Sequence, residues 1–385
     1  MRTEKNGLGN IESTFSSFGY KNKFKIPLYK PLLNGNELRY VSQCITTNWV
    51  SSQGSFVEKF EKNFSKYVGT KYASSTCNGT TALHLSLLAL GIGKGDEVIV
   101  PDLTFVSTAT SVIHAGAKPV FADIDEKTLN IDPQDIRKKI TKKTKAIIPV
   151  HLYGRPAQMK EIIELAQEYD LKVIEDSAES HGAKIGNKKA GSFADLGIFS
   201  FYGNKIMTTG EGGMVVSNNE ELIAKVNLLK NHGMKPNNKY WHEVVGYNYR
   251  MTNIQAALGL AQLEKIEEKI SLKRKIANNY KKLFSETNLT LPSEDKGTKN
   301  VYWLYWVMLK NKNALELIKK LAFSGIETRT FFYPLSSMPI FGKQKKQVNS
   351  HKVFQKGLCL PSFPSITYEE QQEVASKIIG LINQS

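Results

Sequence analysis

Apolar residues along this chain gather in short runs that alternate with stretches of helical spacing. The short runs fall at 97–101, 118–124, 146–152, 172–175, 196–201 and 214–217, and helical spacing appears at 105–114, 132–140 and 159–169. Strands that alternate with helices predict a mostly parallel α/β sheet covered by helices on both faces. In such sheets, ligands bind beyond the carboxyl ends of the strands.

The pattern changes in the last third of the chain. Helical spacing from 254 to about 284 predicts one long helix that leads out of a large domain. An apolar strand at 302–309 and helices near 314–323 and 368–382 predict a compact α+β unit. We therefore expect a flexible N-terminal extension over 1–24, a large domain over 25–262 and a small C-terminal domain over 263–385.

The chain is basic, with a formal net charge of +16 over 385 residues. Its lysines are scattered in short groups, such as Lys138-Lys139 and Lys142-Lys143, and form no stripe with aromatic residues. This distribution favours a generally basic surface, suited to a small anionic ligand, over a nucleic-acid partner.

No sequence feature predicts a metal site, export or a membrane span. Cys44, Cys77 and Cys359 are far apart and form no CxxC pair, so we expect neither a disulfide framework nor a metal centre. The first 20 residues lack the apolar core of a signal peptide, and the longest apolar run, 82–92, is too short to cross a bilayer. We therefore expect a soluble cytoplasmic protein that binds no membrane.

Lys205 is the first candidate for catalysis because of its neighbours. It ends the sequence SFYGNK at 200–205 and precedes a glycine-rich turn at 209–213. A lone lysine is usually a solvated surface charge, but a lysine amine can also form an imine with a carbonyl cofactor. Asp176 follows a predicted strand and could pair with a protonated pyridine nitrogen, or it could simply cap a turn. Taken together, these motifs indicate a pyridoxal 5'-phosphate (PLP) site in the large domain.

Two segments could hold the phosphate of such a cofactor. Gly79 and Thr80 belong to the sequence NGTT at 78–81, which could bind an anion at a helix start or could be an ordinary helix N-cap. Ser200, five residues before Lys205, could donate its hydroxyl to the same phosphate.

Three further residues could lie near the cofactor ring. Phe105 could stack on a flat heteroaromatic ring, or it could belong to the core. Glu179 could contact the ring oxygen or be a polar loop residue. For His181 we favour the interpretation as a polar loop residue.

Seven motifs in this order resemble those of the DegT-type nucleotide-sugar aminotransferases. They are NGTTALHL at 78–85, EVIVP at 97–101, PVHLYG at 149–154, ED at 175–176, SFYGNK at 200–205, GEGG at 210–213 and GYNYRMTN at 246–253. The resemblance extends from about residue 26 to near the carboxyl end. It implies the aspartate-aminotransferase fold, PLP fold type I, with a mostly parallel sheet between helices and a smaller C-terminal α+β domain.

The resemblance also implies roles for individual residues. Lys205 would carry the cofactor as an imine, Asp176 would meet the pyridine nitrogen, and Glu179 would lie near the ring hydroxyl. Gly79, Thr80 and Ser200 would bind the phosphate, and Phe105 would stack on the ring. Asn248 would reach the phosphate of the neighbouring subunit's cofactor, so the resemblance implies a homodimer with shared active sites.

The implied reaction moves the amino group of L-glutamate to C4 of a nucleotide-diphosphate 4-keto-6-deoxy sugar. We expect GDP-4-keto-6-deoxymannose as substrate and GDP-perosamine as product, with UDP- or dTDP-4-keto-6-deoxyglucose as the alternative substrate. Arg329 and Tyr333 would bind the sugar substrate from the segment 329–336. This segment departs from the family at Ser336, where many relatives have a histidine.

Two other functions remain as alternatives. A PLP-dependent sugar dehydratase has the same fold, but relatives that act as 3-dehydratases have a histidine in place of Lys205. A non-catalytic regulator would need neither Lys205 nor Asp176. The presence of both residues favours an aminotransferase.

Overall fold

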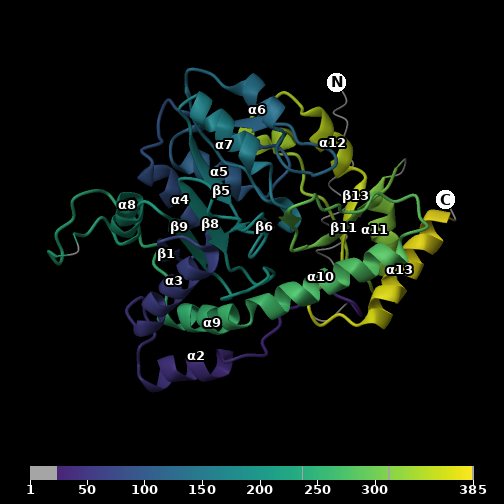
Figure 1. The fold of residues 1–385 in the computed structure, drawn as a ribbon, viewed down its shortest axis with the longest axis horizontal. Coiled ribbons are helices and arrows are strands. Elements are labelled where there is room, and N and C mark those ends of the chain that lie inside the picture. The colour runs from purple at the N-terminus through teal and green to yellow at the C-terminus, as the bar shows by residue number, and fades with distance from the viewer. Residues whose placement is uncertain (1–23, 236, 311–312, 384–385) are drawn as a thin grey trace, which may run out of the picture.

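The computed structural model describes residues 24–235, 237–310 and 313–383 (Figure 1). Its centre is a seven-stranded sheet in the order β1-β9-β8-β5-β4-β2-β3. The strands are β1 (Tyr72–Thr76), β2 (Glu97–Pro101), β3 (Lys118–Ala122), β4 (Thr144–Ile147), β5 (Lys172–Asp176), β8 (Leu196–Ser200) and β9 (Gly213–Ser217). All pairs from β3 to β8 are parallel, and β9 is antiparallel to both neighbours. The predicted mostly parallel sheet is confirmed.

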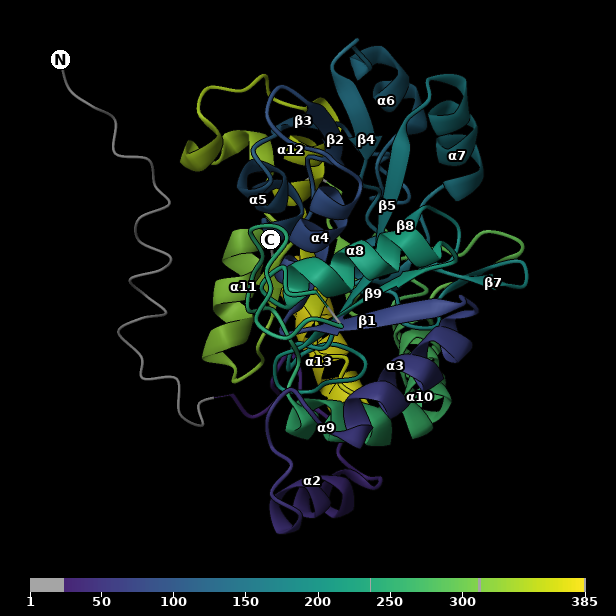
Figure 2. The same ribbon diagram turned by 90° about the vertical axis from the view of Figure 1, so that its left-hand side faces the viewer.

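Helices cover both faces of this sheet because buried side chains alternate in direction along each strand. Val98 and Val100 of β2 pack in one apolar cluster with α4, α5 and α8, whereas Ile99 packs on the opposite face with α6 and α7. The helices of this region are α2 (Glu37–Thr46), α3 (Ser55–Val68), α4 (Gly79–Ala89), α5 (Ser107–His114), α6 (Pro133–Lys139), α7 (Met159–Glu168), α8 (Glu220–Lys230) and α9 (Asn253–Glu264). Figure 2 shows α8 lying across β1 and β9.

The C-terminal region has its own three-stranded antiparallel sheet, in the order β11-β13-β12. Its elements are α10 (Ile266–Leu283), β11 (Tyr305–Met308), α11 (Ala314–Phe323), β12 (Arg329–Thr330), α12 (Val348–Phe354), β13 (Gly357–Leu360) and α13 (Tyr368–Asn383), with short 3₁₀ turns η2 (Leu335–Ser337) and η3 (Pro339–Phe341). Ile26 forms a bridge with Ile326 and joins the apolar cluster of α10, α11 and α13. The start of the described chain therefore packs on the C-terminal region.

Smaller elements complete the described chain. They are the 3₁₀ turn η1 (Leu152–Gly154) and a minor sheet of β6 (Lys184–Ile185), β7 (Lys188–Lys189) and β10 (Thr298–Lys299). No helix in the described ranges is long and apolar enough to cross a membrane.

The prediction of a single helix from 254 to about 284 is wrong. Lys265 has φ −111° and ψ 11°, and it separates α9 from α10. Leu263 and Ile266 are buried on either side of the break, so the apolar spacing continues where the backbone does not. The predicted domain division after residue 262 falls within α9 and stays a prediction, and the predicted extension at 1–24 lies outside the described residues except for Phe24.

Candidate active site

The candidate residues meet at one edge of the central sheet. Asp176 ends β5 and Ser200 ends the adjacent parallel strand β8, so both side chains stand at the carboxyl edge. A cavity of about 430 Å³ opens there, a volume within the roughly 300–1,000 Å³ typical of small-molecule sites. The predicted cofactor and substrate residues that line it are Gly79, Thr80, Phe105, Asp176, Glu179, Ser200, Lys205 and Arg329.

The start of α4 presents free backbone donors to this cavity. Asn78 caps the helix, and its Oδ1 accepts a hydrogen bond from the Thr81 N–H at 2.9 Å. The N–H groups of Gly79 and Thr80 have no hydrogen-bond partner among the described residues. The N-cap interpretation is therefore confirmed. The free N–H groups also suit an anion, because a helix N-terminus carries a partial positive charge.

Strand register places this helix start against Ser200. Gly213 of β9 is paired with Thr76 on one side and with Ser200 on the other. A Cβ on Gly79 would lie 2.8 Å from the Cβ of Ser200, and a Cβ on Gly213 would lie 2.4 Å from the carbonyl oxygen of Asn78. Only glycine fits at these two positions, and the close approach brings the Ser200 hydroxyl beside the helix donors.

The Lys205 amine is buried in the same cavity. Its Nζ lies 3.6 Å from Oε1 of Glu179 and 4.0 Å from the centre of the Trp303 ring. Burial lowers the pKa of Lys205, and the nearby carboxylates of Glu179 and Asp176 oppose that shift. A lowered pKa increases the neutral fraction of an amine, and only the neutral amine can act as a nucleophile or accept a proton.

Asp176 is held rigidly at the end of β5. Its Oδ2 accepts a hydrogen bond from the Thr108 hydroxyl at 2.9 Å, and its Oδ1 accepts one from the Ala178 N–H at 3.2 Å. The residue is 5% exposed. Burial raises the pKa of Asp176, and the hydrogen bonds from Ala178 and Thr108 oppose that shift. The capping interaction with Ala178 is thus present, and the carboxylate also faces the cavity.

Glu179 and His181 follow in the same turn but have different surroundings. Glu179 Oε2 accepts a hydrogen bond from the Tyr153 N–H at 2.8 Å, which fixes the carboxylate beside Lys205. His181 is fully buried, with its ring 5.3 Å from that of Phe199. Burial lowers the pKa of His181 to about 3, so the ring is neutral. His181 lies in a turn, as favoured from the sequence, but it is a core residue and not a solvated one.

Phe105 and Arg329 both lie on the cavity wall. Phe105 is 54% exposed and touches the Phe332 ring at a centroid distance of 6.0 Å, so the core interpretation of Phe105 is wrong. Arg329 lies over the rings of Trp303 and Phe332, at 5.3 and 4.6 Å. Its Nε and Nη2 are buried without a partner among the described residues, which suits an anionic ligand.

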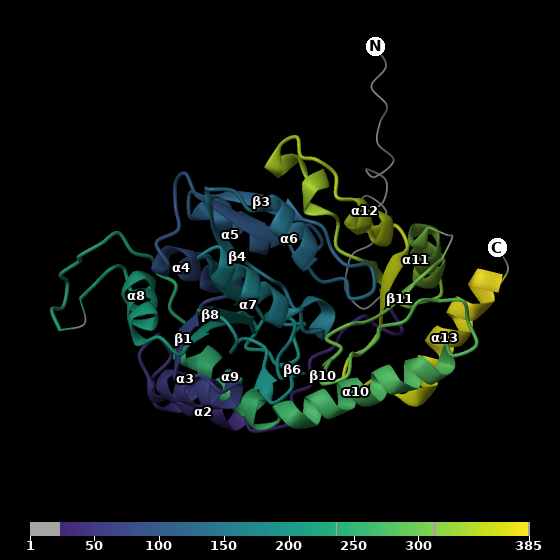
Figure 3. The same cartoon turned by 45° about the horizontal axis from the view of Figure 1, so that its top comes forward.

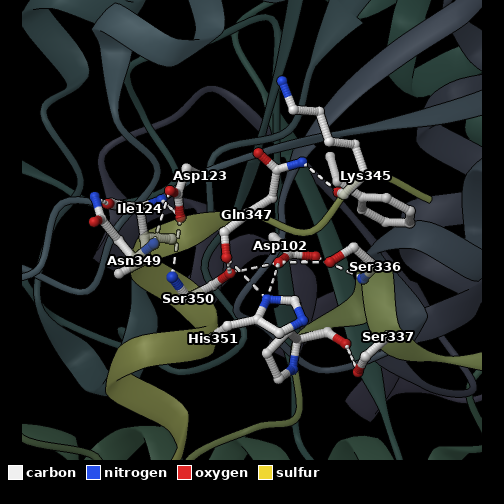
Figure 4. Close-up of polar contacts among 12 residues, drawn as sticks. Asp102, Asp123, Ile124, Ser336, Ser337, Lys345, Gln347, Asn349, Ser350 and His351 are labelled. Atoms are coloured by element: carbon white, nitrogen blue, oxygen red, sulfur yellow. Dashed lines mark hydrogen bonds and ion pairs between the residues drawn. The ribbon is translucent and has the colours of Figure 1, made fainter.

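The carboxylates of Asp102, which is buried, and Asp123, which is partly buried, fix the segment that follows β12 to the central sheet (Figure 4). Asp102, directly after β2, accepts hydrogen bonds from the N–H and hydroxyl of Ser336 at 2.6 and 3.0 Å, and from the Ser350 hydroxyl. Asp123, after β3, accepts from the N–H groups of Asn349 and Ser350 at 2.9 and 3.0 Å. Ser336 therefore faces Asp102 and holds the segment in place, and it does not line the cavity.

Asn248 and Tyr333 do not line this cavity. Asn248 forms a bridge with Asn231 at the base of the loop between α8 and α9, which projects from the body in Figures 1 and 3. Tyr333 lines a second, adjacent cavity of about 320 Å³.

Local sequence patterns give little indication of two other residues in the site, Trp303 and Thr108. Trp303 covers Lys205 and donates its Nε1–H to the Asn204 carbonyl at 2.7 Å, but in the sequence it is only one residue of the apolar run at 302–309. Thr108 lies within the helical stretch predicted at 105–114, and nothing in the sequence marks it as a hydrogen-bond partner of Asp176. Such contacts depend on how the helices pack and have no signature in local spacing.

Comparison with known proteins agrees with this geometry. Residues 31–379 match the DegT/DnrJ/EryC1/StrS aminotransferase family. The chain is 46% identical over 347 residues to a GDP-perosamine synthase from Escherichia coli O157:H7, which covers 90% of this chain and 95% of the relative. It is 40% identical to a GDP-perosamine synthase from Vibrio cholerae, over 93% of this chain and 99% of the relative.

A solved structure shares the fold. The PLP form of a putative sugar aminotransferase from Streptococcus pneumoniae superposes with a TM-score of 0.88 at 25% identity, covering 93% of this chain and 99% of that one. The chain thus belongs to the DegT/DnrJ/EryC1/StrS aminotransferase family and is a PLP-dependent transaminase.

Proposed function

We propose that this enzyme transfers the amino group of L-glutamate to C4 of GDP-4-keto-6-deoxymannose and so makes GDP-perosamine. The main support is the buried Lys205 amine, which shares one cavity with the carboxylates of Asp176 and Glu179. The 46% identity to a GDP-perosamine synthase supports this substrate.

The residues of the cavity fit PLP. The unpartnered N–H groups of Gly79 and Thr80 and the hydroxyl of Ser200 would hold its phosphate, and Phe105 would cover one face of its ring. Asp176 would hold the protonated ring nitrogen, with Glu179 near the ring hydroxyl. When bound, PLP supplies an electron-withdrawing ring that stabilises negative charge on the carbon that loses a proton.

Lys205 has two tasks in this proposal. Its amine would hold the cofactor and would be free for proton transfer once glutamate is bound. The free amine, whose pKa burial lowers, would accept the α-proton of glutamate and would pass that proton to a carbon of the cofactor. Glu179, 3.6 Å away, keeps the amine in position through both half-reactions.

Arg329 and Tyr333 serve the substrates. Two buried guanidinium nitrogens of Arg329, Nε and Nη2, have no partner among the described residues, and we propose that this cation binds an anionic group of the substrates. Glutamate and the sugar nucleotide occupy the site in turn, and one arginine can therefore serve both. Tyr333 lines the adjacent cavity, where the acceptor substrate would extend.

We also propose a homodimer with shared active sites. The loop between α8 and α9 exposes Tyr240, Trp241 and Val245 by 76%, 58% and 88%. Exposed apolar side chains on one projecting loop are typical of a protein interface. A second copy that covers this loop would bring Asn248, at its base, to the phosphate end of the partner's cavity. Three free cysteines fit the cytoplasmic location that we propose.

The substrate is tested by comparing kcat/KM for GDP-4-keto-6-deoxymannose with that for UDP- and dTDP-4-keto-6-deoxyglucose, with glutamate in excess. We expect the GDP-linked sugar to be preferred. A clear preference for either pyrimidine-linked sugar would overturn the substrate assignment and leave the aminotransferase reaction in place. Removal of a sugar hydroxyl without nitrogen transfer would show a dehydratase instead.

A further inference from the structure

The segment PVHLYG at 149–154 takes no part in the chemical steps proposed above, although it is one of the seven motifs of the sequence. Its backbone joins two parts of the fold. The His151 N–H donates to the Asp176 carbonyl at 3.1 Å, and the Gly154 carbonyl accepts from the Val301 N–H at 3.1 Å. The segment therefore links the carboxyl end of β5 to the chain that leads into β11.

Tyr153 lies in this link with an uncommon backbone conformation. Its φ is 54° and its ψ is 17°, in the left-handed region that residues other than glycine rarely adopt. The residue is 2% exposed and does not line the active-site cavity. Buried residues that keep such a conformation cluster at functional sites, where their contacts hold them in place. Tyr153 lies behind the cavity wall, so it acts on the cavity through the residues that it contacts.

The contacts of Tyr153 lead to three residues of that wall. Its N–H donates to Oε2 of Glu179 at 2.8 Å. Its hydroxyl oxygen accepts a hydrogen bond from the Phe332 N–H at 3.2 Å. Its ring is stacked with the rings of Phe332 and Trp303, at centroid distances of 5.7 and 6.3 Å. Glu179, Phe332 and Trp303 all line the cavity.

The two rings that stack on Tyr153 also carry cationic side chains of the cavity. Cζ of Arg329 lies 4.6 Å from the centre of the Phe332 ring and 5.3 Å from that of Trp303. Nζ of Lys205 lies 4.0 Å from the centre of the Trp303 ring. A cation over an aromatic face is attracted to that ring, so a displaced ring displaces the cation.

We propose that Tyr153 is a positioning residue for transamination. Through its backbone and its ring it holds Glu179 and Lys205 in place, and through its hydroxyl and its ring it holds Arg329 at a fixed separation from them. The lysine that carries out proton transfer and the arginine that meets the substrates are thereby fixed to one another. The inference rests on the proposed function, because that function assigns Arg329 to the substrates.

Removing the hydroxyl tests the link to Arg329. Tyr153→Phe keeps the ring and the backbone but leaves the Phe332 N–H without its acceptor, so the segment that carries Arg329 should shift. We expect the apparent Kd for glutamate in the half-reaction to rise about fivefold, which corresponds to one lost hydrogen bond. In an Arg329→Lys background the same change should add less than about twofold, because the group that it positions is already altered. An equal effect in both backgrounds, or no effect in either, would overturn this link.

Tyr280→Phe is the matched control. The Tyr280 hydroxyl is also buried and donates to the Pro361 carbonyl at 2.8 Å, within the apolar cluster of the C-terminal region and away from the cavity wall. Each variant loses one buried hydrogen bond, so both should lower the thermal unfolding temperature. Tyr280→Phe should leave the apparent Kd for glutamate within about twofold of wild type. An equal loss of glutamate binding in Tyr280→Phe would assign the effect to general destabilisation and overturn the positioning role.

Removing the ring tests the link to Lys205. Tyr153→Leu takes away the surface that backs Trp303, so water can approach Lys205 and weaken the burial that lowers its pKa. The absorbance of the bound cofactor reports protonation of the nitrogen through which Lys205 holds it. We expect the pH midpoint of this absorbance to rise by about 0.5 unit or more in Tyr153→Leu and to stay within about 0.2 unit in Tyr153→Phe. An unchanged midpoint in a folded, PLP-loaded Tyr153→Leu enzyme would overturn the link to Lys205.

This titration involves no substrate, so it separates the inference from the proposed function. If the wild type does not react with glutamate, or if Arg329→Lys binds glutamate normally, the proposed donor or the proposed role of Arg329 is wrong. The titration then still decides whether Tyr153 positions Lys205. If Arg329→Lys weakens glutamate binding and Tyr153→Phe does not, the proposed function stands and the positioning of Arg329 by Tyr153 is refuted.

Discussion

Replacing Asp176 by asparagine should separate the electrostatic role of this residue from its structural role. The change keeps the shape of the side chain and removes its charge. Both present partners of the carboxylate can be retained, because the amide oxygen can accept from the Ala178 N–H and the Thr108 hydroxyl can reorient to accept from the amide. We therefore expect the free energy of unfolding to change by about 1 kcal/mol or less.

The effect on catalysis should be much larger. Asp176 is 5% exposed, so little water screens a charge bound against it. Two unit charges about 4 Å apart interact by about 4 kcal/mol at an effective dielectric constant near 20. A tenfold rate change corresponds to about 1.4 kcal/mol, so losing most of this interaction should lower kcat by about 10²- to 10³-fold.

Stopped-flow absorbance of the glutamate half-reaction measures the chemical step directly. The variant should still bind PLP, and its loss should appear in the rate of this step and not in the KM for glutamate. Thr108→Val is the matched control, since it removes one hydrogen bond to Asp176 and keeps the charge, and it should cost less than tenfold. Asp176→Asn turnover within threefold of wild type would refute the electrostatic role.

Three further predictions address other parts of the structure. Borohydride reduction and peptide mapping should place the cofactor mass on Lys205, and an adduct on another lysine would refute the assignment. Mixing Lys205→Ala with Asn248→Ala subunits should restore about a quarter of wild-type activity after random exchange, because half of the dimers then contain one intact shared site; no restoration despite proven exchange would contradict sharing. Burial lowers the pKa of Lys273 to about 7. Between about pH 7 and the usual lysine pKa of 10.5, this lysine is therefore protonated in the unfolded chain and has lost its proton in the folded chain. Urea unfolding should therefore show stability rising with pH in this window, by about 3 kcal/mol between about pH 6 and pH 9 from this group. Lys273→Met should abolish that part of the rise, and the exposed control Lys275→Met should not.

The sequence predicted the strands that carry the site because those strands are continuous apolar runs. Glu97–Pro101 and Lys172–Asp176 are buried along nearly their whole length, which local spacing reports well. β1 was not predicted, because its buried residues are Ser74, Ser75 and Thr76. Their burial depends on distant partners, such as the Glu61 carboxylate that accepts from Ser75 at 2.7 Å.

In the active site, too, local motifs could be predicted from the sequence and contacts between distant segments could not. Lys205 and Asp176 belong to recognisable local motifs, and the structure brings both to one cavity. Trp303 and the Asp102–Ser336 contact join segments about one hundred and more than two hundred residues apart, so only the packed fold reveals them. The sequence shows only that the segment departs from the family at Ser336, whereas the structure shows that Ser336 is hydrogen-bonded to Asp102.

Nitrogen transfer itself is the most direct test of the proposed function. The enzyme is incubated with PLP, ¹⁵N-labelled L-glutamate and GDP-4-keto-6-deoxymannose, and the sugar product is examined by NMR and mass spectrometry. We predict a ¹⁵N atom bonded to C4 of a GDP-linked 4-amino-4,6-dideoxy sugar, with one 2-oxoglutarate released for each product molecule. Unlabelled product, label on another carbon, or 2-oxoglutarate formed without aminated sugar would contradict the account.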